Sequence, residues 1–145
     1  MKIAIASDHG GYDYKKVLIP VIEKLGHEVR DFGCESSDAV DYSDFAFTAG
    51  EAVAKGEYDR GILICGTGIG MSIAANKVKG VRCALCTDPL MARLTREHND
   101  TNMLALGGRI IGIELAKEIV SVWLTTPFSG ADRHSRRIQK ITDYE

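Results

Sequence analysis

Short apolar stretches alternate with segments of helical spacing along the whole sequence, and this alternation limits the fold more than any other feature. Five stretches, most of them apolar, are expected to form strands: Lys2–Ala6, Glu28–Phe32, Gly61–Cys65 within Arg60–Cys65, Val81–Thr87 and Met103–Leu106. Strands that are apolar throughout belong in a parallel sheet that helices cover on both faces. With right-handed crossovers, the pattern predicts an α/β fold: a doubly wound, Rossmann-like, three-layer fold with a five-stranded parallel sheet.

Helices are expected over Tyr12–Leu25, from Ser43 or Asp44 to Ala54, and over Met71–Val78, Pro89–Glu97, Gly112–Leu124 and Asp132–Ile141. The last one forms a C-terminal helical tail. The spacing predicts that the first helix has one apolar face, made of Val17, Leu18, Val21, Ile22 and Leu25. Pro20 is expected to kink or restart that helix. The expected caps are Ser43 or Asp44, Asp88 and Asp132.

The chain has 145 residues, 45% of them hydrophobic, and residues 1–145 are expected to form one domain with one core. A formal net charge of −2 gives no overall basic field that would favour nucleic acid or a membrane surface, so any anion must be recognised locally. The first residues have too short an apolar stretch for a signal peptide, and no run is long enough to span a bilayer. A cytoplasmic location is therefore expected.

Four cysteines are present, namely Cys34, Cys65, Cys83 and Cys86. Cys83 and Cys86 have the spacing of a redox or zinc pair, but residues three apart on a strand point to opposite faces. They are therefore interpreted as small core residues, and a chain of this size can build its core without disulfides.

Ligands of such folds bind beyond the carboxyl ends of the strands, which selects Ser7–Gly11, Cys65–Gly70, Thr87–Asp88 and Gly107–Arg109. Cys65–Gly70 is the strongest candidate. A thiol at a strand end that faces a helix N-terminus is favoured as the thiolate, and the amides of a glycine-rich loop can bind an oxyanion. Enolisation requires a base beside such a nest.

Three other interpretations of this segment stay open. Gly66-Thr67-Gly68-Ile69-Gly70 matches part of a dinucleotide fingerprint, although its spacing is G-x-G-x-G and no acidic residue ends a following strand. Cys65 could also be a buried strand residue beside a tight turn, or it could have a redox role.

Three further groups could carry chemistry. Asp8 and His9 reach the sheet rim after the first strand, unless Asp8 only caps the first helix. His98 can transfer a proton near neutral pH, or it can interact with the helix dipole for structural reasons alone. The basic group consists of Arg109, Arg133, His134, Arg136 and Arg137. Arginine forks match phosphate oxygens, although such runs are usually only solvated. A helix would put Arg133 and Arg137 on one face and Arg136 elsewhere.

Together these segments resemble the type B ribose-5-phosphate isomerases and their relatives, the galactose-6-phosphate isomerase subunits. The matching stretches are Ser7-Asp8-His9-Gly10-Gly11, Asp41-Tyr42, Ile64 to Gly70, Ala74-Ala75-Asn76-Lys77, His98-Asn99-Asp100-Thr101-Asn102 and Gly107-Gly108-Arg109. The likeness covers nearly the whole chain, including the Arg133–Arg137 tail. It implies an aldose–ketose isomerase of the pentose phosphate pathway, which interconverts ribose 5-phosphate and ribulose 5-phosphate through an enediolate.

The resemblance also implies roles for individual residues. Cys65 would be the proton acceptor at C2 and C1, and His98 would open the furanose ring. Thr67 would assist the Gly66–Gly70 backbone in holding the enediolate. The residues that would bind the sugar or its phosphate are Asp8, His9, Tyr42, Gly66, Gly68, Ile69, Gly70, Asn99, Arg109, Arg133 and Arg137. No step exchanges electrons, and the sequence has no compact His/Asp/Glu cluster, so no cofactor and no metal are expected.

In that family two subunits share each site, so a homodimer is implied and a tetramer is possible. Because this chain keeps Asp8-His9, Cys65 and His98-Asn99 together, a self-sufficient homo-oligomer is favoured over a pair of different subunits. Three alternatives stay open. They are a six-carbon substrate (allose 6-phosphate or galactose 6-phosphate), a free aldose, and a non-enzymatic nucleotide- or phosphate-binding module.

Overall fold

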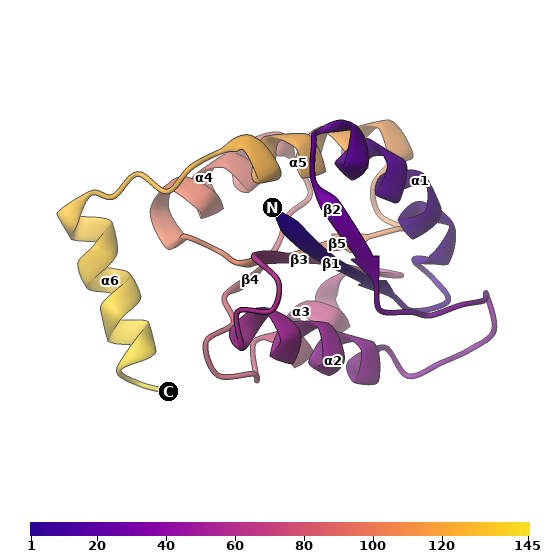
Figure 1. Cartoon of the computed structure of the whole chain (residues 1–145), viewed down its shortest axis with the longest axis horizontal. Helices are drawn as coiled ribbons and strands as arrows, with labels where there is room; N and C mark the ends of the chain where they lie inside the picture. The colour runs from indigo at the N-terminus through magenta and orange to yellow at the C-terminus, as the bar shows by residue number, and fades with distance from the viewer.

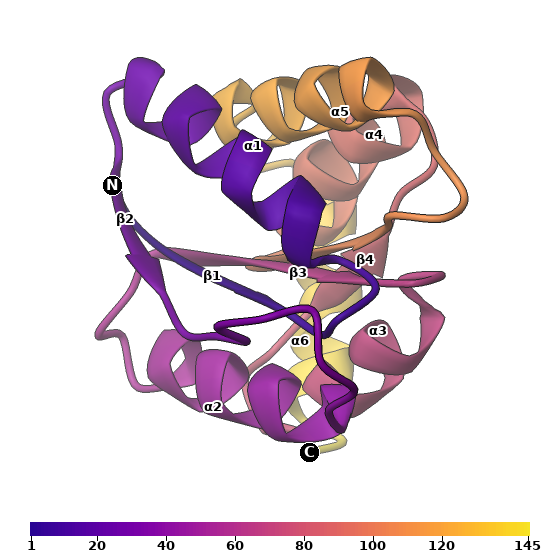
Figure 2. The same ribbon diagram turned by 90° about the vertical axis from the view of Figure 1, so that its right-hand side faces the viewer.

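A computed structural model describes the whole chain, residues 1–145, as a parallel five-stranded sheet between two layers of helices. The strands are β1 (Lys2–Ser7), β2 (Glu28–Asp31), β3 (Arg60–Cys65), β4 (Cys83–Leu85) and β5 (Met103–Gly107), in the order β2-β1-β3-β5-β4. The helices are α1 (Tyr12–Lys24), α2 (Tyr42–Ala54), α3 (Ile69–Ala75), α4 (Pro89–Asn99), α5 (Ile113–Thr125) and α6 (Asp132–Thr142). Helices α1, α4 and α5 cover one face of the sheet, and α2 and α3 cover the other (Figures 1 and 2). The predicted doubly wound α/β fold is confirmed.

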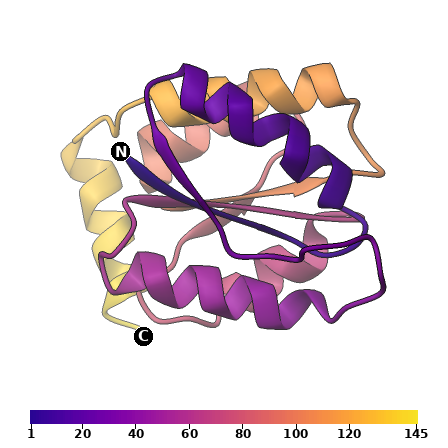
Figure 3. The same ribbon diagram turned by 45° about the vertical axis from the view of Figure 1, so that its right-hand side comes forward.

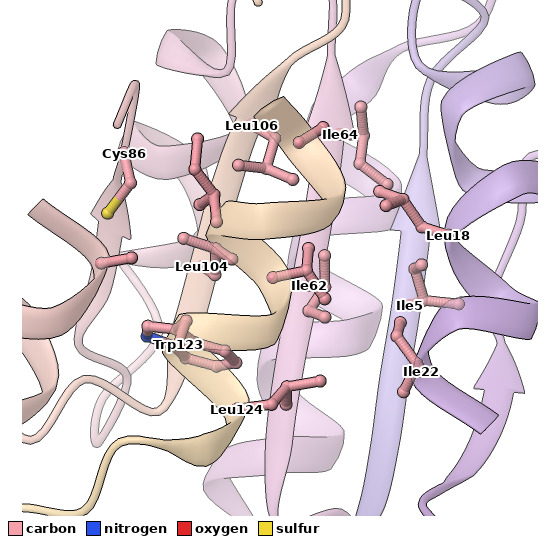
Figure 4. Close-up of a cluster of buried hydrophobic side chains, with 14 of the residues drawn as sticks. Ile5, Leu18, Ile22, Ile62, Ile64, Cys86, Leu104, Leu106, Trp123 and Leu124 are labelled. Carbon is pink, nitrogen blue, oxygen red and sulfur yellow. The ribbon is translucent and has the colours of Figure 1, made fainter. Parts of the chain in front are cut away.

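The core is divided by the sheet, because successive strand residues point to opposite faces. On β3, Ile62 and Ile64 join a cluster of 16 buried residues beneath α1 and α5, which also contains Trp123 (Figure 4). Leu63 and Cys65 join the second cluster, of 13 residues, beneath α2 and α3. The Cys65 side chain therefore points toward α2 and α3.

The inner face of α1 differs from the expected one. Leu18 and Ile22 are fully buried, but the third inward residue is Lys15, and Val17 is 39% exposed. The Lys15 ammonium can lie there because it donates to Asp31 Oδ1, at 2.8 Å, and to the Cys34 carbonyl. The helix also continues through Pro20, so the expected restart does not occur.

The boundaries of other elements follow local hydrogen bonds. Asp88 caps α4 as expected, because its Oδ1 accepts from the Met91 amide at 2.9 Å. The caps expected for α2 and α6 are wrong: the residues that precede these helices are Asp41 and Ala131, and neither makes a side-chain cap bond. Asp132 is instead the first helical residue of α6.

Cys83 and Cys86 pack on opposite sides of the sheet, as the strand spacing predicts. Cys86 belongs to the cluster beneath α5, and Cys83 packs against the cluster beneath α2 and α3. Burial raises the pKa of each thiol to about 12, so both stay protonated. All four cysteines are free.

Helix α6 stands outside the three layers. It lies beyond the amino ends of the strands, whereas the loop between β2 and α2 lies at their carboxyl ends (Figures 1 and 3). Its contact with the rest of the chain is mainly with α4, through the buried His134. No helix is long and apolar enough to cross a membrane.

Candidate active site

Strands β1 and β3 are neighbours in the sheet although α1, β2 and α2 separate them in the chain. The chain crosses from β1 to one side of the sheet, to β2, and from β3 to the other side, to β4. The gap between β1 and β3 is therefore the topological switch point, where doubly wound folds bind ligands. Ser7 pairs with Ile64 in register. Asp8 and Cys65, the next residue on each strand, consequently lie beside each other at the carboxyl edge.

The Cys65 sulfur is held by the turn that follows its strand. Its Sγ accepts a hydrogen bond from the Gly68 amide at 3.0 Å, and the residue is 4% exposed. Gly68 has a φ of 79°, and a Cβ on it would lie only 2.9 Å from the Leu106 carbonyl carbon, so the turn requires glycine. The amides of Gly66, Thr67 and Gly70 make no hydrogen bond within the chain.

Asp8 and His9 line the same edge. Asp8 Oδ1 accepts from the amides of Gly10, at 2.8 Å, and Gly11, at 3.1 Å, so this carboxylate also holds the turn before α1. His9 Nδ1 accepts from the Val40 amide at 3.3 Å. With Nδ1 occupied as an acceptor, neutral His9 carries its proton on Nε2, which makes that atom a donor.

Arg109 and Tyr42 complete this edge. The Arg109 amide donates to the Gly66 carbonyl at 2.9 Å, and its guanidinium lies over Gly66, with Nη1 3.4 Å from where a Cβ would stand. The Tyr42 ring lies against Gly70, 2.7 Å from the corresponding position. Thr67 is exposed, and its Oγ1 accepts from the Ile69 amide at 3.2 Å. We call the set the carboxyl-edge cluster: Asp8, His9, Tyr42, Cys65, Gly66 to Gly70, and Arg109.

The remaining predicted residues gather elsewhere, in an amino-edge cluster of His98, Asn99, Arg133, His134 and Arg137. The rings of His98 and His134 have centroids 4.3 Å apart, and His134 Nδ1 is 2.8 Å from Ser129 Oγ. Burial, and then the nearby charges of His98, Arg133 and Arg137, lower the pKa of His134. Arg133 and Arg137 are exposed on α6.

The two clusters lie at opposite edges of the sheet, because α4 returns the chain to the amino ends of the strands. The segment after Asn99 is tied to that edge, where the Gly61 amide donates to the Asn102 carbonyl at 2.9 Å. Gly61 and Cys65 are four residue steps apart along β3, which corresponds to about 13 Å. One copy of the chain therefore cannot bring His98 to a carbon atom in contact with Cys65.

Fold and edge geometry together define a class of protein: a doubly wound α/β protein with a thiol and free backbone amides at its switch point. Within that class, the chain belongs to the ribose/galactose isomerase family, whose model matches residues 3–141. It is an aldose–ketose isomerase, so the non-enzymatic alternative is set aside.

Two curated relatives and one solved structure give the degree of similarity. The chain is 49% identical to ribose-5-phosphate isomerase B of Escherichia coli, over 99% of this chain and 96% of that protein. It is 40% identical to D-erythrulose-4-phosphate isomerase of Pectobacterium atrosepticum, over 100% and 95%. The structure of Clostridium thermocellum ribose-5-phosphate isomerase B superimposes with a TM-score of 0.97 at 54% identity, covering 99% of this chain and 97% of that one.

Proposed function

We propose that this protein interconverts ribose 5-phosphate and ribulose 5-phosphate in the pentose phosphate pathway, with Cys65 as the base. The observation that carries the proposal is the Cys65 sulfur at the switch point, bonded to the Gly68 amide beside three free amides. The names of the Escherichia coli and Clostridium thermocellum relatives support the choice of substrate. The proposed location is the cytoplasm, where a free thiol stays reduced.

In the proposed mechanism, the Cys65 thiolate removes the proton from C2 of the open-chain aldose. The C–H electrons form the C1–C2 double bond, and the carbonyl electrons move to O1, which gives an enediolate. A proton then passes from the C2 hydroxyl oxygen to O1, the thiol returns its proton to C1, and the carbonyl forms at C2. The Gly68 amide stabilises negative charge on the sulfur before and after each transfer.

The enediolate oxygen would be held by the free amides of Gly66, Thr67 and Gly70, with Gly68 and Ile69 shaping the turn and the Thr67 hydroxyl assisting. Losing one donor of this kind typically costs roughly 3–4 kcal/mol of transition-state stabilisation. Asp8, His9 and Tyr42 would bind the sugar, with His9 offering its Nε2 proton. Arg109, whose guanidinium lies over Gly66, would neutralise charge at the same place.

Ring opening and phosphate binding fall to the amino-edge cluster. His98 would donate the proton that opens the furanose, Asn99 would bind a hydroxyl, and Arg133 and Arg137 would hold the phosphate. Because one copy keeps the two clusters apart, a complete site requires a second copy, in a homodimer whose subunits each contribute one cluster.

A second copy has an apolar surface to bind. Strand β4 is an edge of the sheet, and α3 and α4 lie on the same side of the molecule (Figure 2). Apolar side chains of α3, α4 and the turn after β5 are 37–59% exposed, namely Ile69, Ile73, Leu90, Met91, Leu94 and Ile110. Exposed apolar side chains in this number favour association.

The test is incubation with ribose 5-phosphate in deuterated water. We expect ribulose 5-phosphate to form and deuterium to appear at C2 of the recovered ribose 5-phosphate. Failure to form ribulose 5-phosphate would exclude the substrate. Conversion with complete retention of hydrogen at every stage would exclude the enediolate route.

A second substrate class has a specific observation in its favour. One relative, 40% identical over the whole chain, is named for D-erythrulose 4-phosphate. We propose that a four-carbon sugar phosphate also reacts at this site. The test is to measure kcat/KM for erythrose 4-phosphate and for ribose 5-phosphate. The larger value identifies the better substrate.

A further inference from the structure

The turn between α4 and β5 has an unusual backbone. Asp100 ends α4 with a φ of 44° and a ψ of 49°, and it is the one non-glycine residue with positive φ. Glycine is the ordinary residue at such a helix end, because it adopts the left-handed conformation without strain. An aspartate at this position has a conformational cost, so the contacts of its carboxylate must compensate for it.

The Asp100 carboxylate lies between two arginines. Its Oδ1 forms an ion pair with Arg96 Nη1 at 2.8 Å, and its Oδ2 is 3.5 Å from Arg82 Nη2. Arg82 also holds the backbone of the same turn, since its Nη2 donates to the Asp100 carbonyl at 2.8 Å and its Nε donates to the Asn99 carbonyl at 3.0 Å. Arg82, in the segment before β4, therefore holds the C-terminal end of α4 through backbone hydrogen bonds.

Arg96 fixes the other side of the turn. It is 5% exposed, and its guanidinium donates to the carbonyls of Thr101, at 2.6 Å, and Thr126, at 3.3 Å. A buried guanidinium needs a compensating charge, and Asp100 supplies it. The Thr101 hydroxyl in turn accepts from the Trp123 indole at 3.0 Å. The turn after α4 is therefore held by Arg82 from the segment before β4, by Arg96 of α4 and by Trp123 of α5.

His98 and Asn99 are the last two residues of α4, directly before this turn. We propose that Arg82, Arg96 and Asp100 form a clamp that positions His98 and Asn99 for the substrate. The clamp residues are positioning residues, and none of them touches the sugar. This inference rests on the proposed ring-opening role of His98.

The test is a double-mutant cycle on ribose 5-phosphate with His98→Asn and Asp100→Gly. Asp100→Gly removes the clamp carboxylate, and because glycine adopts the left-handed conformation without strain, part of the cost of leaving Arg96 without its compensating charge is offset. We expect kcat/KM to fall by about 100-fold in Asp100→Gly, the size that follows from a misplaced catalytic group. If Asp100 acts through His98, the double variant should be little worse than His98→Asn alone.

A second substrate separates positioning from general damage. Erythrose 4-phosphate cannot close a five-membered ring, because its C4 oxygen carries the phosphate. Asp100→Gly should therefore lose much less activity on erythrose 4-phosphate than on ribose 5-phosphate, as should His98→Asn. Arg82→Gln leaves the buried Arg96–Asp100 pair in place. It should also lose more activity on ribose 5-phosphate than on erythrose 4-phosphate, but both losses should be smaller than in Asp100→Gly.

The matched control is Asp59→Asn, at another carboxylate that holds backbone at this edge of the sheet through the Lys2 amide, at 2.6 Å. It should leave both activities unchanged. Multiplicative losses in the double variant, or equal losses on both sugars, would overturn the clamp. If His98→Asn itself had no effect, the proposed role of His98 would be wrong instead.

Discussion

Residue Cys65 is 4% exposed, and its sulfur has one polar partner, the Gly68 amide at 3.0 Å. A thiolate in this position is directed by the turn that holds it, so its reactivity depends on the geometry of the loop as much as on the cysteine. The neighbouring amides of Gly66, Thr67 and Gly70, which are the proposed oxyanion donors, belong to the same turn as the amide that holds the sulfur.

Replacing the sulfur gives the first prediction. Cys65→Ala should keep the fold and lower kcat for ribose 5-phosphate by about 10²–10⁴-fold, the range that a positioned acid–base group contributes. The matched control is Cys83→Ala, since burial raises the pKa of that thiol to about 12 and keeps it protonated. A Cys65 variant with near-normal kcat and native circular dichroism would remove this residue as the base.

His27 gives a prediction about pH and stability. Its Nδ1 is 3.4 Å from the Met1 amine, and its buried Nε2 has no partner. Burial, followed by the charges of the N-terminus and Arg60, lowers the pKa of His27 below 6.5. The unfolded state then binds the proton more readily, so stability that is present above pH 6.5 is lost as the pH falls toward the folded-state pKa.

The measurement is urea unfolding at about pH 7.5 and about pH 5.5. His27→Gln should reduce the loss of unfolding free energy between these two pH values, because glutamine does not titrate. The lowered pKa of His134 acts in the same direction, so part of the loss should remain. Glu28→Gln, at the adjacent exposed residue, should leave the wild-type loss unchanged. An identical loss in His27→Gln and wild type would count against the assignment.

At the scale of elements, α6 presents a charged face with little support from its own domain. Arg133 and Arg137 are one turn apart and exposed, and Arg136 lies on another side of the helix. Charge-assisted bonds to phosphate are worth about 1.5–3 kcal/mol, which corresponds to a loss of roughly 10- to 150-fold when one is removed. Arg137→Ala should therefore raise KM for ribose 5-phosphate by about this factor, with a smaller effect on kcat.

Arg136→Ala is the control for this change, because it removes the same charge from a different face of α6. Its KM should stay close to that of the wild type in steady-state assays. Equal increases in KM for the two variants would show that the net charge of the helix matters, and not a specific phosphate contact.

The elements show where sequence patterns suffice. The apolar run predicts β3 as Gly61–Cys65, and the strand begins one residue earlier because Arg60 pairs with Ile3 of β1. The run Val81–Thr87 predicts a longer β4 than Cys83–Leu85, since Val81 is buried by packing and Cys86, although its amide donates to the Ala105 carbonyl, lies beyond the last paired residue. A run of apolar residues indicates which residues are buried. The first and last residues of a strand depend instead on where the neighbouring strand pairs with it.

The burial of Lys15 could not be predicted in the same way. Its place on the inner stripe of α1 depends on Asp31 and the Cys34 carbonyl, which approach only after β2 has paired with β1. Most of the carboxyl-edge cluster could be predicted, because its members follow strand ends, whereas Tyr42, the first residue of α2, comes only from the family resemblance. The clamp around Asp100 could not, because no pattern in the sequence marks Arg82 and Arg96 as its partners.

At the scale of the whole molecule, the sheet separates the two clusters. Cys65 lies at one end of β3, and the segment after His98 is tied to the other end through Gly61. A substrate that contacts both clusters must therefore lie between two copies. In a dimer with two-fold symmetry, each of the two sites then takes its carboxyl-edge cluster from one subunit and its amino-edge cluster from the other.

This arrangement predicts complementation between two inactive variants. In a heterodimer of Cys65→Ala and His98→Asn chains, one site carries both substitutions and the other carries neither. Heterodimers purified through two different tags should therefore have about half of the wild-type kcat, although each homodimer is nearly inactive. A heterodimer of Cys65→Ala and Arg109→Ala, two changes within the carboxyl-edge cluster, leaves no site intact and should stay inactive. Sites built within single chains would give the opposite result for the first pair: no recovery, because each chain would carry its own defect.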